Sequence, residues 1–341
     1  MTSSHKTTFP DVIIGVDKIA TRILRPSVDE NGVTSVEIIW EPKEGDESLN
    51  SSYTDVKRVT INGIDSVLVT RTKKQPHVMA INYHTRSTYW SEKGNDLSKL
   101  QGGVHTATYV DSPVGHGSIA VGIPFSKDTV EAKGKFTNMM YINIKDKRAI
   151  ECDFQDNHAS LWIDKGDGLG GGILWAVGRD TPQNAKNAKQ GKCILRGYYP
   201  SEDGDINPRP RNTDDIILVD SPEELTYMNQ KGWYESPHDI TRRDINTLWI
   251  STESRVVAYD FSTKKVTLIS NSLILADREK SDTLEKHPSA TNLKSLNCKR
   301  DFILYTQTMG ESSDTDSFCI VFGGRKYVFR MESRIYKARW A

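Results

Sequence analysis

Short runs of alternating, β-branched or aromatic residues recur along the whole chain, and Gly, Pro, Asn and Asp interrupt them at short intervals. Alternation of apolar and polar positions is typical of half-buried β-strands, and frequent turn residues separate such strands in antiparallel sheets. The pattern therefore predicts a mostly β fold. The clearest predicted strands are Val12–Val16, Ser35–Trp40, Val56–Ile61, Ser66–Thr70, His77–Tyr83, Thr106–Val110, Ser118–Ile123, Met139–Ile144, Ser160–Ile163, Gly172–Val177, Cys193–Tyr199, Asp215–Val219, Thr247–Ser251, Val256–Asp260, Val266–Ile269, Phe302–Gln307, Phe318–Phe322, Tyr327–Met331 and Arg334–Trp340.

One short helix is predicted from Pro222 to Lys231. Ser221 supplies a hydroxyl N-cap, Pro222 suits the first helical position, and Glu224 completes a capping box. The segment Thr181–Gln190 is a second helix candidate, but its polar composition favours an exposed loop.

Four segments share one shape, in which an apolar strand, a polar turn and a second strand ending in an aromatic residue follow one another. They are Val78–Trp90, Met140–Phe154, Leu248–Phe261 and Phe318–Phe329. A further strand extends the third segment, and the meander Leu248–Ile269 looks like the inner three strands of a β-propeller blade. Blades of about 50 to 60 residues predict an irregular β-propeller of five or six blades for 341 residues.

Radial closure would make residues 1–341 a single propeller-like unit, because it leaves few exposed strand edges. The alternative is two β-sandwich domains, 1–180 and 191–341, divided near Thr181–Gly191 or near Gly204–Arg211. The segment Ala276–Ser295 is rich in Lys, Glu, Asp and Ser and is predicted to be a long exposed loop.

The charges balance, with 45 Lys and Arg against 45 Asp and Glu. This balance argues against nucleic acid and anionic membrane surfaces as partners. No apolar stretch reaches the roughly 20 residues that span a bilayer, and no signal peptide is visible at the N-terminus. We predict a soluble, cytoplasmic protein, in which the dispersed Cys152, Cys193, Cys298 and Cys319 are reduced.

His105, Asp111 and His116 bracket a predicted strand and the Gly- and Pro-containing turn after it. A histidine serves as a general base or a metal ligand, and an aspartate orients it or shares the metal. These three are the candidate catalytic residues if the protein is an enzyme. Their spacing matches no metal signature, so a chance cluster is the alternative interpretation.

Asp203, Asp205 and Asn207 occupy positions 1, 3 and 5 of a calcium-loop pattern. Pro208 then stands where the loop glycine belongs, and Asp214 stands where a glutamate is expected. The three residues are a weak candidate metal site, and a divalent cation is the only candidate cofactor. A solvated acidic turn is the alternative.

A glycine-dense turn, Asp164–Gly172, lies beside two carboxylates. Glycine lets backbone amides approach a ligand closely. The acidic local charge argues against a phosphate and leaves a sugar hydroxyl as the candidate ligand; a plain β-turn is the alternative.

Aromatic residues stand next to one another at strand ends, as in Tyr89-Trp90, and Tyr199 and Trp233 also have aromatic neighbours. Neighbouring strand residues face opposite sides, so one ring of each pair is expected in the core and the other at the surface. An exposed ring is a platform for a sugar's apolar face or a partner's side chain. Trp90, Tyr89, Tyr199 and Trp233 are therefore the candidate ligand-binding residues.

No nucleophile elbow, zinc signature or phosphate-binding loop occurs in the sequence. Together with the balanced charge and the aromatic pairs, this favours a module that binds a carbohydrate or a protein partner over an enzyme. The alternatives are a hydrolase or lyase, assisted by a metal at the His and Asp site, and a structural assembly subunit.

Overall fold

The computed structural model describes residues 6–16, 19–49, 53–71, 77–93, 97, 104–111, 117–122, 139–152, 154, 156–164, 172–180, 192–199, 215–219, 236–252, 255–269, 293–308 and 315–341. The regular structure of these residues is built from β-strands. In chain order the strands are β1 (Thr7–Thr8), β2 (Val12–Val16), β3 (Thr21–Val28), β4 (Thr34–Trp40), β5 (Tyr53–Ile61), β6 (Ile64–Arg71), β7 (His77–Asn82), β8 (Thr88–Lys93), β9 (Thr106–Val110), β10 (Ser118–Gly122), β11 (Met139–Asn143), β12 (Ala149–Cys152), β13 (Ala159–Ile163), β14 (Ile173–Asp180), β15 (Lys192–Tyr198), β16 (Ile216–Val219), β17 (Pro237–Arg242), β18 (Thr247–Thr252), β19 (Val256–Asp260), β20 (Lys265–Ile269), β21 (Leu293–Lys299), β22 (Phe302–Gln307), β23 (Thr315–Phe322) and β24 (Arg325–Trp340).

Four of the sheets contain four strands each, in the order β5 to β8, β9 to β12, β13 to β16 and β17 to β20. Within each sheet the neighbouring strands are antiparallel and consecutive in the chain, as the pairs β5 with β6 and β18 with β19 illustrate. Such four-stranded meanders are the blades of a β-propeller.

The remaining sheet has eight strands because β24 belongs to two blades. Residues Arg325–Arg330 of β24 pair with β23 and complete a blade with β21 and β22. Residues Ile335–Trp340 pair with β2, and β3 and β4 continue that blade outward. The two ends of the chain therefore share one blade.

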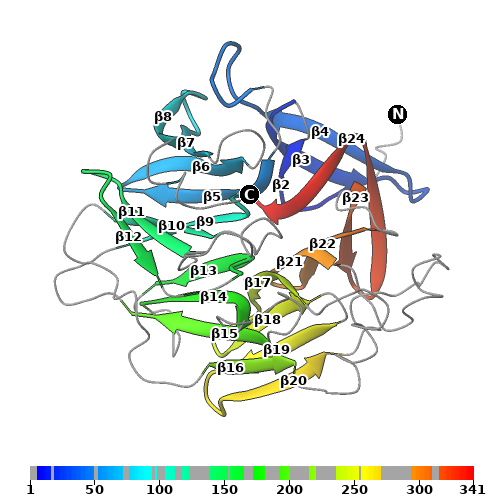
Figure 1. The fold of residues 1–341 in the computed structure, drawn as a ribbon. Helices are drawn as coiled ribbons and strands as arrows, with labels where there is room; N and C mark the ends of the chain where they lie inside the picture. Colours follow the sequence, from blue (N-terminus) through cyan, green and yellow to red (C-terminus); the bar gives the residue numbers. More distant parts are fainter. Residues whose placement is uncertain are drawn as a thin grey trace.

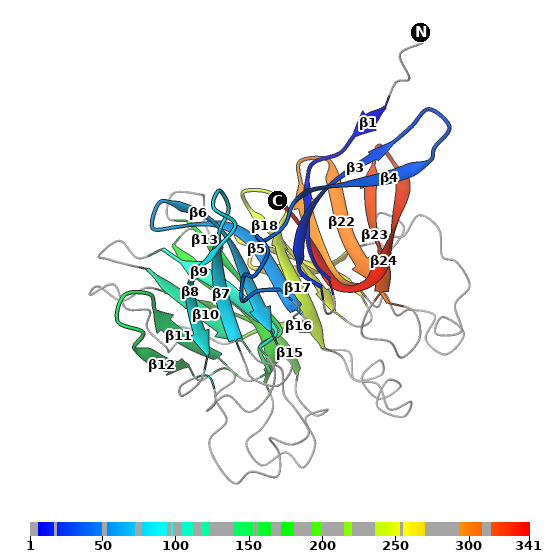
Figure 2. The same ribbon diagram turned by 90° about the horizontal axis from the view of Figure 1, so that it is seen from above.

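Each blade has one innermost strand, which lies at the centre of the molecule. Strands β5, β9, β13, β17, β21 and the last part of β24 contact one another in this order, and β24 contacts β5. The described strands thus form a closed ring of six blades, which Figure 1 shows in face view and Figure 2 from above, with the β3–β4 hairpin extending away from the ring. The predicted β-propeller is confirmed.

The hydrophobic core is divided among the interfaces between neighbouring blades. Each of six buried clusters combines residues of two adjacent blades. Val78 of β7 and Ile119 of β10 belong to one cluster, for example. Ile13 of β2 and Met79 of β7 belong to another, so the blade that contains both chain ends packs against the first blade like any other pair. Full burial of each large apolar side chain contributes about 1.5–3 kcal/mol.

The sequence pattern misses two of the six innermost strands, β17 and β21. The meander Leu248–Ile269 forms β18, β19 and β20, but these are the outer three strands of their blade, since β17 lies inside them. Neither β17 nor β21 is among the predicted strands, because polar side chains such as Asp239 and Ser295 interrupt their apolar pattern. The predicted loop Ala276–Ser295 is accordingly wrong at its end, where Leu293–Ser295 begins β21.

Two strands differ from prediction for backbone reasons. β3 contains Pro26, which removes an amide donor and therefore argues against a strand in the sequence. The predicted strands Tyr327–Met331 and Arg334–Trp340 form one strand, β24, whose register with β23 shifts between Thr315 and Ser317.

The predicted helix Pro222–Lys231 and the segment Thr181–Gln190 lie outside the described residues. All four cysteines are free, as predicted, and Cys298 is the partly exposed one. Within the described part of the chain, no helix has the length and apolar character needed to cross a membrane.

We predict that the last strand is needed for the propeller to fold. Deletion of residues 335–341 would remove the inner strand of the closing blade and leave the inner edge of β2 unpaired, with β3 still on its outer edge. We expect the truncated chain to lose cooperative unfolding, as followed by circular dichroism during heating. Deletion of residues 1–8 is the control, because β1 pairs with β3 only through Thr7 and Thr8, which are both exposed. Equal unfolding of the two truncated chains would contradict this role for β24.

Candidate functional site

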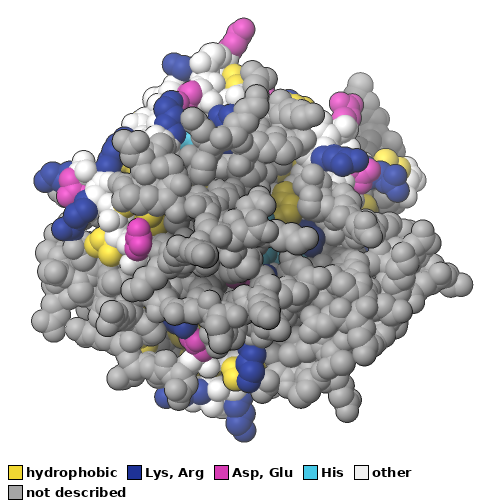
Figure 3. All heavy atoms as spheres, in the orientation of Figure 1, with side chains coloured by type: hydrophobic (Ala, Val, Ile, Leu, Met, Phe, Trp, Pro, Cys, Tyr) yellow, Lys and Arg dark blue, Asp and Glu magenta, His cyan; other side chains and the backbone are white. Residues whose placement is uncertain are grey.

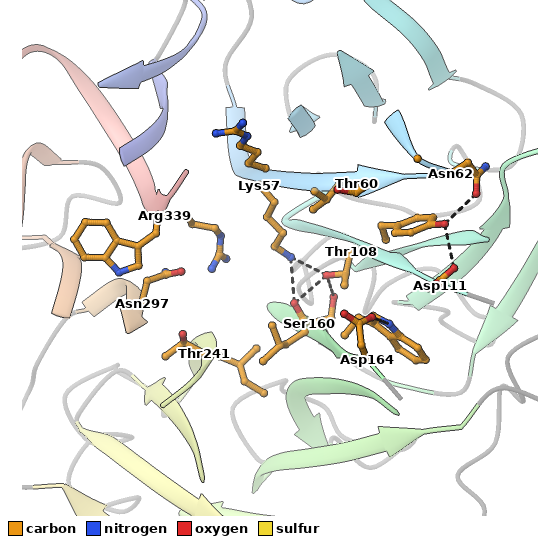
Figure 4. Close-up of a pocket in the computed structure, with 18 residues that line it drawn as sticks. Lys57, Thr60, Asn62, Thr108, Asp111, Ser160, Asp164, Thr241, Asn297 and Arg339 are labelled. Carbon is orange, nitrogen blue, oxygen red and sulfur yellow. Dashed lines mark hydrogen bonds between the residues drawn. The ribbon is translucent and has the colours of Figure 1, made fainter. Parts of the chain in front are cut away.

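A pocket of about 590 Å³ opens at the centre of the propeller, at the ends where the inner strands finish. Every inner strand contributes to its wall, as Figure 4 shows for Lys57, Thr108, Ser160, Thr241 and the residues around them. Because adjacent inner strands carry polar side chains toward the axis, the pocket wall places polar groups beside apolar ones. The lining residues are Lys57, Arg58, Val59, Thr60, Asn62, Gly63, Thr108, Tyr109, Asp111, Ser160, Leu161, Trp162, Asp164, Ile240, Thr241, Asn297, Arg339 and Trp340.

The floor of the pocket is built around the guanidinium of Arg339. Its Nε donates to Asp55 Oδ1 at 2.8 Å, and its Nη2 and Nη1 donate to the two carboxylate oxygens of Asp239 at 2.7 and 3.2 Å. Asp239 also accepts from the backbone N–H of Leu296 at 2.9 Å. All three charged side chains are buried, so these paired hydrogen bonds replace the water that each charge has lost.

Lys57 lies beside this group on β5. Its Nζ forms an ion pair with Asp55 Oδ2 at 3.1 Å. Its other acceptors, between 2.7 and 3.2 Å away, are Thr108 Oγ1, Ala107 O, Ser160 O and Thr106 Oγ1. An ammonium has three N–H donors, so these oxygens satisfy the hydrogen-bonding capacity of Lys57 completely.

The buried charges change one another's proton affinities. Burial lowers the pKa of Lys57 to about 8, against the attraction of Asp55. Burial alone would raise the pKa of Asp55, but the cations Arg339 and Lys57 hold it well below its ordinary value. Near neutral pH the floor therefore carries ionised groups of both signs.

The rim of the pocket combines aromatic rings with carboxylates. Trp162 donates its indole N–H to Asp164 at 2.7 Å, and the Tyr109 hydroxyl lies 3.0 Å from Asn62 Oδ1 and 3.4 Å from Asp111 Oδ1. Asp111 and Asp164 directly follow β9 and β13 and are both exposed. The rim thus presents hydrogen-bond acceptors next to flat apolar surfaces, and Figure 4 shows both carboxylates on the same side of the pocket.

Three histidines line the opposite end of the inner strands. The His158 ring contacts those of His105 and His238 edge to face, with centroids 5.7 and 5.6 Å apart. The His105 ring also contacts the Tyr336 ring, with the two centroids 5.8 Å apart. Burial lowers the pKa of His105 well below its ordinary value, so its ring is neutral near pH 7.

His158 forms a cluster with Asp156 and Ser236 that resembles a catalytic triad in composition. Both Asp156 Oδ1 and Ser236 Oγ lie 3.1 Å from the same ring nitrogen, Nε2. A proton relay needs the carboxylate and the hydroxyl on different nitrogens. Asp156 is instead paired with the buried Arg179, and the cluster is organised as a structural ion pair.

The predicted catalytic residues do not come together in the described part of the structure. His105 precedes β9 and Asp111 follows it, so the two lie at opposite ends of that strand, and His116 lies outside the described residues. Asp111 lines the pocket, whereas His105 belongs to the histidines at the other end. Asp203, Asp205 and Asn207 also lie outside the described residues. Among the described residues, no group of three or more His, Cys, Asp or Glu side chains is arranged to hold a metal ion.

The predicted ligand-binding aromatics lie away from the pocket or outside the described residues. Trp90 is buried in the cluster between the first two blades. Tyr89 is 40% exposed and its hydroxyl lies 2.8 Å from Ser66 Oγ, and Tyr199 is 38% exposed. The expected split of the Tyr89-Trp90 pair between surface and core is therefore correct. Trp233 lies outside the described residues.

Sequence reasoning does not find Lys57, Asp55, Asp239 or Arg339, which form the floor. Their signal is the alternation of polar residues along inner strands, as in Asp55 and Lys57 of β5. Figure 3 shows positive and negative side chains interspersed around the edge of one face.

Comparisons with known proteins show no family for this chain. No protein-family model and no curated protein matches the chain. Among solved structures, a protein of unknown function from Bacteroides caccae is 11% identical with a TM-score of 0.48, covering 97% of this chain and 98% of its own. A chain of the mitotic checkpoint complex is 10% identical with a TM-score of 0.46, covering 98% of this chain and 86% of its own. A luciferin-regenerating enzyme is 10% identical with a TM-score of 0.45, and the match covers 97% of this chain and 95% of that enzyme's chain. None of these similarities is high enough to transfer a function.

We predict that Asp239→Asn destabilises the protein by about 3–5 kcal/mol, because it leaves the buried Arg339 with one carboxylate partner. Asp11→Asn is the matched control, since it breaks the exposed Asp11–Arg25 pair and should cost less than about 1 kcal/mol. Denaturant unfolding measures both free energies. If the two variants lose the same stability, the ionic floor does not hold the inner strands together.

Proposed function

We propose that this protein binds a carbohydrate in the central pocket. The observation that carries the proposal is the chemistry of the pocket wall, where aromatic rings, carboxylates, amides and hydroxyls stand side by side. Sugar hydroxyls both donate and accept hydrogen bonds, and the C–H face of a sugar ring packs on an aromatic ring. A wall with both polar groups and aromatic rings therefore matches the hydroxyl groups and the C–H face of a sugar.

The rim supplies the acceptors and the aromatic surface. Asp164 keeps free acceptor capacity after it accepts the Trp162 indole N–H, since a carboxylate has about four lone-pair sites. The same hydrogen bond fixes the partly buried ring of Trp162 beside the carboxylate. Ring and carboxylate are therefore held in one arrangement before a ligand arrives, which reduces the entropy cost of binding.

The size of the pocket supports a small ligand. Its volume of about 590 Å³ falls within the range of about 300–1,000 Å³ that small-molecule sites occupy. This suits one or two sugar rings. The exposed Tyr89 and Tyr199 lie outside the pocket, so the candidate aromatic contacts are Trp162, Tyr109 and Trp340.

A glycan array identifies the sugar, and calorimetric titration of the purified protein then tests the site. We expect Asp164→Asn to weaken binding about tenfold, because a charged acceptor is replaced by a neutral amide. Asp316→Asn is the control, since Asp316 is an exposed carboxylate on β23 that does not line the pocket. An array without any bound glycan, or equal affinities of the two variants, would refute the proposal.

A further inference from the structure

The floor of the pocket holds more positive than negative charge. Lys57, Lys337 and Arg339 face one another and two carboxylates, Asp55 and Asp239, and all five are electrostatically coupled. Among the described residues, these three cations against two anions leave one excess positive charge at and beneath the base of the pocket. Lys337 is 2% exposed, and within the described contacts its Nζ donates one hydrogen bond, to His158 O at 3.3 Å. Solvent therefore screens this excess charge poorly.

Arg339 can still donate toward the pocket. A guanidinium has five N–H donors, and the described contacts of Arg339 with Asp55 and Asp239 occupy three of them. Arg339 lines the pocket together with Asn297, whose Nδ2 lies 3.4 Å from Asp239 Oδ2. One N–H group remains on each of Nη1 and Nη2, and the two point in different directions, so a single N–H can meet an incoming carboxylate.

The rim has the opposite charge. The cations near the mouth are already paired, as Arg58 is with Asp65, whereas Asp111 and Asp164 accept hydrogen bonds only from neutral donors in the described contacts. Asp111 is three residues beyond Thr108 along the β9 direction, which places it about 10 Å above the floor at roughly 3.3 Å per residue. The pocket is thus positive at its base and negative at its mouth.

We infer that the sugar bound in this pocket carries a carboxylate, as uronic and sialic acids do, and that this carboxylate lies at the floor, where Arg339 donates to it and the charge of Lys57 attracts it. The inference rests on the proposed carbohydrate function and names the class of sugar. The ligand's negative charge neutralises the excess charge of the base, while its hydroxyls point to Asp111 and Asp164. The reverse orientation would bring the ligand's carboxylate against those two aspartates.

The test compares matched ligands on the unmodified protein by calorimetry at pH 6.5, where Lys57 is protonated. The ligands are glucuronic acid, its methyl ester and glucose, followed by sialic acid and its methyl ester. We expect each acid to bind about tenfold more tightly than its ester and than the neutral sugar. Equal affinities for acid, ester and neutral sugar would overturn the inference and leave the carbohydrate function standing. Failure of every sugar to bind would refute the carbohydrate function itself.

A substitution locates the charge effect. Lys57→Met removes one cation from the floor, and we expect it to reduce the preference for acid over ester about tenfold. Lys145→Met is the control, because Lys145 is an exposed lysine outside the pocket, and it should leave the preference unchanged. An unchanged preference in Lys57→Met would place the carboxylate away from the floor. Because the comparison of acid with ester on the unmodified protein needs no variant, the inference is also tested if Lys57→Met fails to fold.

Discussion

Arg339 joins parts of the chain that no local interaction could bring together. Its partners Asp55 and Asp239 are 284 and 100 residues away in the sequence. In a poorly solvated channel, each of these charges is costly unless it is paired with good geometry, so the three inner strands that carry them have one favourable relative register. The same guanidinium lines the pocket, and the group that orders the centre of the propeller is also a group that a ligand would meet.

Apolar and polar contacts have different tasks in this fold. The clusters between blades supply non-directional attraction, which tolerates small shifts of one blade against the next. The hydrogen bonds along the axis are directional and fix the height of each inner strand. Lys57, for example, binds oxygens of both β9 and β13 and so ties three consecutive inner strands together.

Most strands could be predicted from the sequence because they are short runs of β-branched and aromatic residues that end at turn residues, even where both faces of the strand are buried. Thr106–Val110 and Val256–Asp260 are found with their observed bounds. The site could not be predicted, because a polar residue that faces a narrow channel has the same place in the alternation as one that faces water. Asp239 in β17 shows this, since only the closed ring of inner strands reveals that its carboxylate is buried.

Strand β24 leaves the ribosome after every other described strand, and this order has a cost for the nascent chain. Until β24 arrives, β2 lacks its inner neighbour and presents an unpaired edge to the solvent. The growing chain must keep that edge from joining the strands of other chains throughout the synthesis of the intervening blades. Pairing of such distant segments is slow, so the interval before closure is the period in which this protein is most exposed to aggregation and to capture by chaperones.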